Sequence, residues 1–205
     1  MRLPTTPATT LLREVRDEVR QRFPGGRVII AIGGRDGRDG RDGRDGRDDS
    51  GGAAFADALA EAFEEQDLDT FRASTQAFLA PRADSTDVNA AHLYDFETMR
   101  RVLIDPFRDG AQTSATTGFQ LGAWDAARNA PLESRWVTAH ADAVLLIDGF
   151  PLASAAQHSF WDFSIWLEAA TPGTTTADAE SAPAAASIVI NNLDPARPVR
   201  VRSGR

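Results

Sequence analysis

Two patterns of apolar residues alternate along the chain and predict alternating strands and helices. Continuous apolar runs occur at residues 28–32 and 143–147. Such runs are typical of strands that are buried on both faces, as in a parallel sheet. Three further runs, at residues 71–74, 163–167 and 187–190, are predicted as strands of the same sheet.

Segments with helical periodicity lie between the predicted strands. The first predicted helix is capped by Thr9 or Thr10, ends before residues 24–26, and carries apolar residues at Leu11, Leu12, Val15 and Val19. The second has its apolar face at Phe55, Leu59 and Phe63. A third is capped by Asp95 and stops before Pro106, because proline cannot continue a helix. Residues 108–135 are rich in Gly, Thr and Ala and are predicted to be irregular.

Composition narrows the classes of function. The chain has 205 residues, which suits one α/β domain with a real core. Its formal net charge of -8 argues against nucleic-acid binding, which requires a basic surface. No secretory signal or membrane-length apolar run is visible, so we expect a cytoplasmic protein with no membrane contact. Cysteine and lysine are both absent, so mechanisms that need either residue are excluded.

Residues 34–48 are five consecutive Gly-Arg-Asp triplets. A collagen-like or calcium-binding repeat is not supported, because the run lacks proline and the calcium-binding period of nine residues. Each Arg has an Asp beside it, so the segment is self-neutralised. We predict a solvated low-complexity loop over residues 34–50.

The order of the segments resembles the uridine kinase-like family of P-loop nucleoside kinases. The resemblance is carried by residues 27–37, 55–60, 103–108, 148–152, 161–167 and 192–198, together with Phe78 and residues 81–82. It covers about residues 11–200, with tails at 1–10 and 201–205. It implies a three-layer α/β/α fold with a mainly parallel sheet, and ATP and Mg²⁺ as cofactors.

The phosphate-binding loop of that family, G-x-x-x-x-G-K-[ST], is degenerate in this chain. Gly46, Ser50 and Gly51 fall within the first six positions of the motif, but Gly52 stands at the lysine and Ala53 at the hydroxyl position. The side chains that reach the phosphates and Mg²⁺ in the family are therefore missing. Acidic residues at 48 and 49 would also repel phosphate.

The resemblance also places substrate and metal residues. Gln76 stands where the family has the Asp that acts as base toward the sugar hydroxyl, and glutamine is not a useful base at neutral pH. Asp148 is placed at a metal-facing strand end, where it either holds Mg²⁺ through water or remains as a solvated acid. Phe78, Arg82 and Tyr94 would lie on the substrate side, although Tyr94 and Asp95 fit a helix cap better.

The Arg-rich lid of the family is reduced to a linker over residues 169–186, which contain no arginine. Together these losses predict a nucleoside kinase-like protein with impaired phosphoryl transfer. Two alternatives remain open. The chain could be an active phosphotransferase in which arginines of residues 35–47 replace the lysine. It could also be a non-catalytic partner of an intact kinase, as a homo- or hetero-oligomer, with a nucleoside or nucleotide as ligand.

Overall fold

The computed structural model describes residues 2–34, 51–80, 94–113, 118–133, 135–149, 159–168 and 186–203. The predictions for residues 35–50 of the Gly-Arg-Asp loop, including Gly46 and Ser50, lie outside these ranges, as do those for Arg82 and the linker of residues 169–185. Gly34, the first residue of the predicted loop, belongs to a strand instead.

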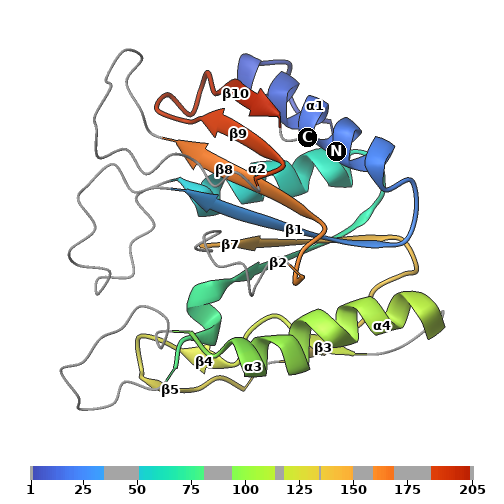
Figure 1. Ribbon diagram of the computed structural model, residues 1–205, viewed down its shortest axis with the longest axis vertical. Helices are drawn as coiled ribbons and strands as arrows, with labels where there is room; N and C mark the ends of the chain where they lie inside the picture. Colours follow the sequence, from blue (N-terminus) through green and yellow to red (C-terminus); the bar gives the residue numbers. More distant parts are fainter. Residues whose placement is uncertain are drawn as a thin grey trace.

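Six of the described strands form one sheet in the order β10-β9-β8-β1-β7-β2 (Figure 1). They are β1 (Arg27–Gly34), β2 (Asp69–Ser74), β7 (Ala143–Asp148), β8 (Phe163–Glu168), β9 (Ile188–Asn191) and β10 (Val199–Ser203). All neighbouring pairs are parallel except β9 with β10. The predicted mainly parallel sheet is confirmed, and so are the five strands predicted from the apolar runs.

Strand β1 shows why a continuous apolar run suits the centre of this sheet. Its side chains alternate between two cores, with Val28, Ile30 and Ile32 in one and Ile29 and Ala31 in the other. Each of these residues is at most 2% exposed. Both faces are therefore covered, as expected for a strand inside a parallel sheet.

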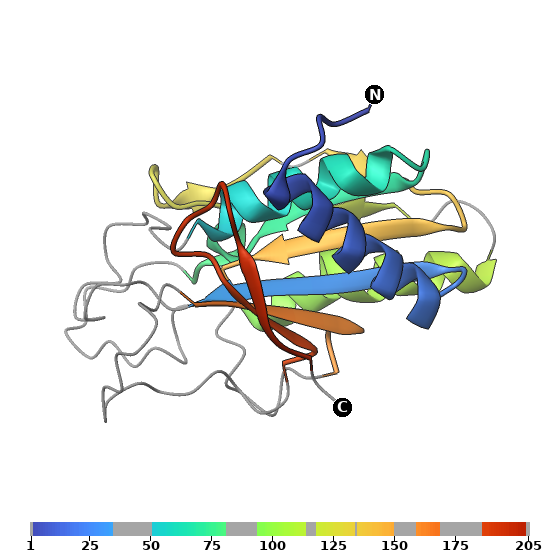
Figure 2. The same cartoon turned by 90° about the horizontal axis from the view of Figure 1, so that it is seen from above.

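Two helices cover the first face, α1 (Pro7–Arg22) and α2 (Gly52–Glu64), and they lie against each other (Figure 2). The predicted cap of α1 was wrong, because the helix begins at Pro7. Thr6 is the N-cap, and its side chain accepts a hydrogen bond from the Thr9 N–H at 3.1 Å. Thr9 completes a capping box from inside the helix, and Pro7 occupies a first-turn position that needs no N–H donor.

One continuous helical run covers the other face. It consists of α3 (Phe96–Met99), a π-helical turn (η3, Arg100–Ile104) and α4 (Asp105–Thr113). The prediction that the helix stops before Pro106 was wrong. Pro106 is the second residue of α4, one position beyond the π-helical turn, and such a widened turn accommodates a residue that lacks an N–H donor. Asp95 caps the run as predicted, because its Oδ1 accepts from the Thr98 N–H at 2.9 Å.

Residues 108–135 are more regular than predicted, because α4 includes residues 108–113 and short strands follow from residue 119. The described part contains two short antiparallel ribbons, β3 (Phe119–Gln120) with β6 (Trp136–Val137) and β4 (Trp124–Asp125) with β5 (Ala130–Pro131). Phe119 is fully buried, and its ring packs edge-on against Phe71 and Phe107. A single buried aromatic residue thus anchors a segment whose composition suggests a loop.

Arg200 and Arg202 belong to strand β10, which includes residues 201–203 of the predicted tail. Arg200 forms an ion pair with Glu18 of α1, and this pair joins the edge of the sheet to the helix layer. Among the helices that the structure describes, none has the length and apolarity needed to cross a bilayer.

Candidate functional site

The candidate site lies where the parallel strands end. The carboxyl ends of β1, β7 and β8 point to the same side of the molecule (Figure 1). Asp148, the last residue of β7, is in register with Ile32 of β1 and with Ser74 of β2. In open α/β sheets, ligands bind at the carboxyl ends of the strands, so this edge is the expected place for chemistry.

Helix α2 begins at this edge with residues that carry almost no side chain. Its N-cap, Gly51, has a left-handed backbone with φ of 68°, and no side chain caps the helix. A Cβ at Gly51 would lie 3.2 Å from Nδ2 of Asn192, so both the backbone and the space favour glycine. Gly52 and Ala53 form the first turn. Helix α2 therefore begins at Gly52, the position at which the family motif has its lysine.

A turn after β7 locks the ends of two strands together. Gly149 has φ of 85°, and its N–H donates to the carbonyl of Ile32 at 3.1 Å. The buried Thr75 donates from Oγ1 to the Gly149 carbonyl at 3.0 Å. A Cβ at Gly149 would lie 2.6 Å from that same Oγ1, so only glycine fits. This turn holds the adjacent Asp148 in place.

Asp148 is buried and paired, which corrects the expectation of a solvated acid. The residue is 5% exposed, and its Oδ1 lies 2.8 Å from Nη1 of Arg72 on the neighbouring strand β2. Arg72 also donates from Nε to Asp57 Oδ1 at 2.8 Å and from Nη2 to the Ala53 carbonyl at 3.2 Å. Sequence reasoning missed Arg72, although a charged residue inside the apolar run of residues 71–74 was a visible signal.

The described residues do not fit the Mg²⁺ that the fold family implies. Ala53 presents a methyl group where a hydroxyl would bind the metal, and one oxygen of Asp148 already faces a guanidinium. Within the described ranges there is also no group of three or more His, Cys, Asp or Glu side chains that could hold a metal ion.

The residues predicted for the substrate side differ in their contacts in the described part of the chain. Phe78 is 1% exposed and belongs to the core, and its carbonyl accepts from the Asp95 N–H at 2.7 Å. Tyr94 forms an antiparallel bridge with Leu79, and its ring lies 5.7 Å from that of Phe96. Gln76 lies in the 3₁₀ turn η1 (Thr75–Phe78) that follows β2. The structure thus gives Phe78 a packing role, whereas Gln76 lies close in sequence to the strand end.

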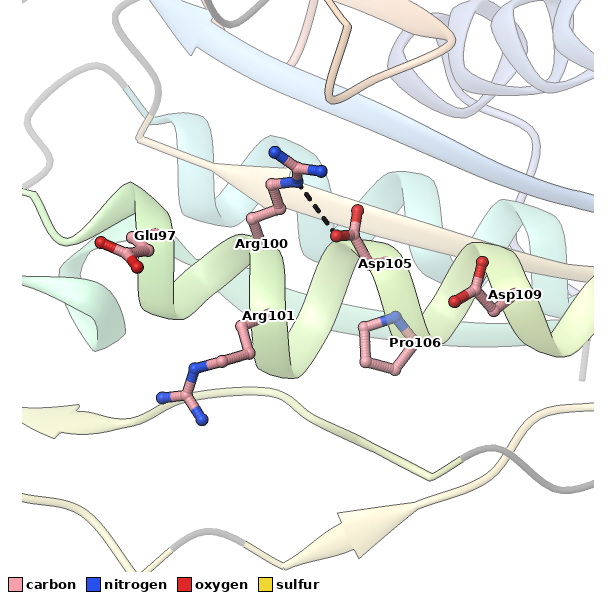
Figure 3. A pocket seen from close by; sticks show the side chains of 6 residues that line it. All are labelled: Glu97, Arg100, Arg101, Asp105, Pro106 and Asp109. Carbon is pink, nitrogen blue, oxygen red and sulfur yellow. Dashed lines mark hydrogen bonds and ion pairs between the residues drawn. The ribbon is translucent and has the colours of Figure 1, made fainter.

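A pocket of about 340 Å³ lies elsewhere, along the outer face of the α3–α4 run (Figure 3). Charged side chains of both signs line it, and Arg100 pairs with Asp105 at 3.0 Å. A second groove of about 630 Å³ lies between the start of α1 and β10. Neither pocket involves the carboxyl ends of the parallel strands.

Solved structures with the same architecture are kinase-like proteins. One is described as a possible uridine kinase from Bacillus stearothermophilus, with 17% identity, a TM-score of 0.54, and coverage of 76% of this chain and 80% of that one. Another is described as a fructose transport system kinase from Silicibacter sp. TM1040, with 22% identity, a TM-score of 0.53, and coverage of 80% and 75%. The chain has a P-loop kinase-like fold. The sequence matches no protein-family model, and a search of curated proteins found no match.

Proposed function

We propose that the chain is a cytoplasmic nucleoside kinase-like protein in which phosphoryl transfer is severely impaired. The observation that carries this proposal is the first turn of α2. It starts at the carboxyl edge of the sheet, where a phosphate-binding helix is expected, and it presents Gly52 and Ala53. Neither residue can place a positive charge or a hydroxyl group at a phosphate.

The expected loss in rate is large. Phosphoryl transfer depends almost entirely on positioning and on stabilisation of charge. Removing a single preorganised donor costs about 100- to 1000-fold in other enzymes. Here Gln76 also stands in the place of the sugar-side base, so a second contribution is missing. The combined loss need not be multiplicative, but it leaves little of the ordinary rate.

Among the described residues, Arg72 is a cation close to the first turn of α2, which makes it a candidate to replace the lysine. Its guanidinium instead donates to Asp57 and to the Ala53 carbonyl, and it forms an ion pair with Asp148. This geometry does not favour an active phosphotransferase built on Arg72. An active enzyme rebuilt with arginines of residues 35–47 is tested by the experiments below.

A coupled assay of ATP consumption with uridine and cytidine tests the proposal directly. We expect turnover far below the roughly 1–100 s⁻¹ of ordinary kinases. Turnover within that range would contradict the proposal and favour the rebuilt loop. Differential scanning fluorimetry with Mg-ATP provides a second readout, since an intact nucleotide site raises the melting temperature.

Restoring the motif makes the strongest prediction of this proposal. The double variant Gly52→Lys/Ala53→Thr supplies the charge and the hydroxyl, so we expect thermal stabilisation by ATP where the wild type shows little. The matched control is Gly52→Met/Ala53→Thr, which has a side chain of similar length without charge. Equal stabilisation of wild type, control and Lys variant by ATP would show that the missing charge does not limit binding.

A further inference from the structure

The contacts of Arg72 point to a property of the site beyond the loss of the motif. We propose that the Arg72 guanidinium is the permanent cation of this site and that it excludes divalent metal ions from Asp148. This inference deepens the proposed function, because it concerns the same strand ends, but it makes a claim about metal binding alone.

The guanidinium lies on the kind of oxygens that a divalent cation prefers. Nη1 lies 2.8 Å from a carboxylate oxygen of Asp148, and Nη2 donates to the carbonyl oxygen of Ala53 at 3.2 Å. Carboxylate and backbone carbonyl oxygens are typical ligands of Mg²⁺ and Ca²⁺. The two oxygens come from the end of β7 and the first turn of α2, the two elements that meet at the candidate site.

The position of the guanidinium is fixed by a further contact. Nε of Arg72 donates to Asp57 Oδ1 at 2.8 Å, one turn further along α2. The planar fork of an arginine therefore joins β2, α2 and β7 at one point. A shorter or more flexible cation would not reach these oxygens in the same geometry.

Charge and burial stabilise the ion pair between Arg72 and Asp148. The side chain of Asp148 is 7% exposed and that of Arg72 is 23% exposed. A buried carboxylate requires an opposite charge close by, and the Arg72 guanidinium provides one. A divalent ion bound to the same carboxylate would lie within a few ångströms of the guanidinium, where little water screens the repulsion. Metal binding therefore requires displacement of Arg72.

Titration of the full-length protein with Mn²⁺, without nucleotide, tests this inference by electron paramagnetic resonance or calorimetry. We expect the variant Arg72→Gln to bind one Mn²⁺ at least about tenfold more tightly than the wild type. The gain should disappear in Arg72→Gln/Asp148→Asn. Arg72→Lys retains a cation but loses the planar fork that reaches both oxygens, so its affinity for Mn²⁺ should lie between those of the wild type and Arg72→Gln. Arg100→Gln changes the net charge equally on the distant helix α3–α4 and should resemble the wild type.

A folded Arg72→Gln variant with no gain in affinity would overturn the proposal. If that variant does not fold, the wild type decides: a 1:1 Mn²⁺ site that Asp148→Asn abolishes overturns the proposal, and its absence supports it. Because no nucleotide is present, the outcome is independent of the kinase assays. Kinase activity at an ordinary rate would refute the proposed function but would not contradict this inference about metal binding.

Discussion

The two ends of the central sheet each contain an arginine from a strand, and the arginines have different partners. At the amino end of β1, Arg27 donates to the carbonyls of Phe107 at 2.8 Å, Ala139 at 2.5 Å and His140 at 3.0 Å. At the carboxyl end, Arg72 pairs with Asp57 and Asp148 and donates to one carbonyl. One guanidinium thus satisfies backbone groups, whereas the other mainly neutralises carboxylates.

The different partners suggest different roles for the two ends of the sheet: the amino end contributes to stability, and the carboxyl end is the candidate binding site. Burial lowers the pKa of Arg27 from its ordinary value, and the charge of Asp69 partly opposes this effect. The Arg27 guanidinium joins β1, α4 and the segment before β7. At the other end, the charged groups face the edge where a ligand would bind. We therefore expect changes at the amino end to affect stability, and changes at the carboxyl end to affect binding.

The largest effect on stability is expected for Arg27→Met. Loss of the guanidinium leaves carbonyls of Phe107 and Ala139 in the interior without this donor, and the free energy of unfolding should fall by about 3 kcal/mol. Urea denaturation measures the change. Arg128→Met is the control, because its side chain is 83% exposed and its pairing with Asp125 is weak. A similar loss of unfolding free energy in both variants would contradict a specific role of Arg27 in stabilising the amino end of the sheet.

A smaller effect is expected for Gly110→Ala in α4. Alanine normally favours a helix over glycine by about 1 kcal/mol. Here a Cβ would lie 1.7 Å from Nη1 of Arg27, which hydrogen bonds hold in place. We expect a destabilisation of about 1–3 kcal/mol instead.

The control for this prediction is the same substitution in an Arg27→Met background. The clash is then relieved, so Gly110→Ala should cost much less or become stabilising. An equal cost in both backgrounds would contradict the close packing of Gly110 against Arg27.

The smallest effect is expected at Glu65, just beyond the C-terminal end of α2, and its size should change with pH only at low pH. Hydrogen bonds from Arg13 and from the Leu3 N–H lower the pKa of Glu65 to about 2. An unfolded glutamate has a pKa of about 4.3, so this group stabilises the fold above that pH. The stabilisation is lost as the pH falls toward 2.

Comparison of melting temperatures from pH 7 to pH 2 checks this prediction. The advantage of the wild type over Glu65→Gln should be constant above about pH 5 and shrink below it. Glu64→Gln changes an exposed neighbour and serves as the control. An advantage of the wild type over Glu65→Gln that does not change with pH would exclude the proposed titration.

Local patterns in the sequence were sufficient for most of the scaffold. The runs at residues 28–32 and 143–147 predict buried strands because no solvated strand tolerates apolar residues on both faces. The same reasoning failed for segments whose conformation depends on contacts with residues far away in the sequence. The small residues of 108–135 suggested irregular structure, yet Phe119 anchors part of this segment in the core. Residues 201–205 were assigned to a tail, yet residues 201–203 belong to β10, which pairs with β9, and Arg200 forms an ion pair with Glu18.

The sequence by itself determined which chemical groups are present. It has no lysine, and it offers glycine and alanine at residues 52 and 53 and glutamine at residue 76, none of which depends on folding. Only the tertiary structure decided which groups meet. Arg72 and Asp148 are 76 residues apart in the chain, and parallel pairing of β2 with β7 brings them within 2.8 Å. No local pattern encodes such a pairing, because it follows from the order of strands in the sheet.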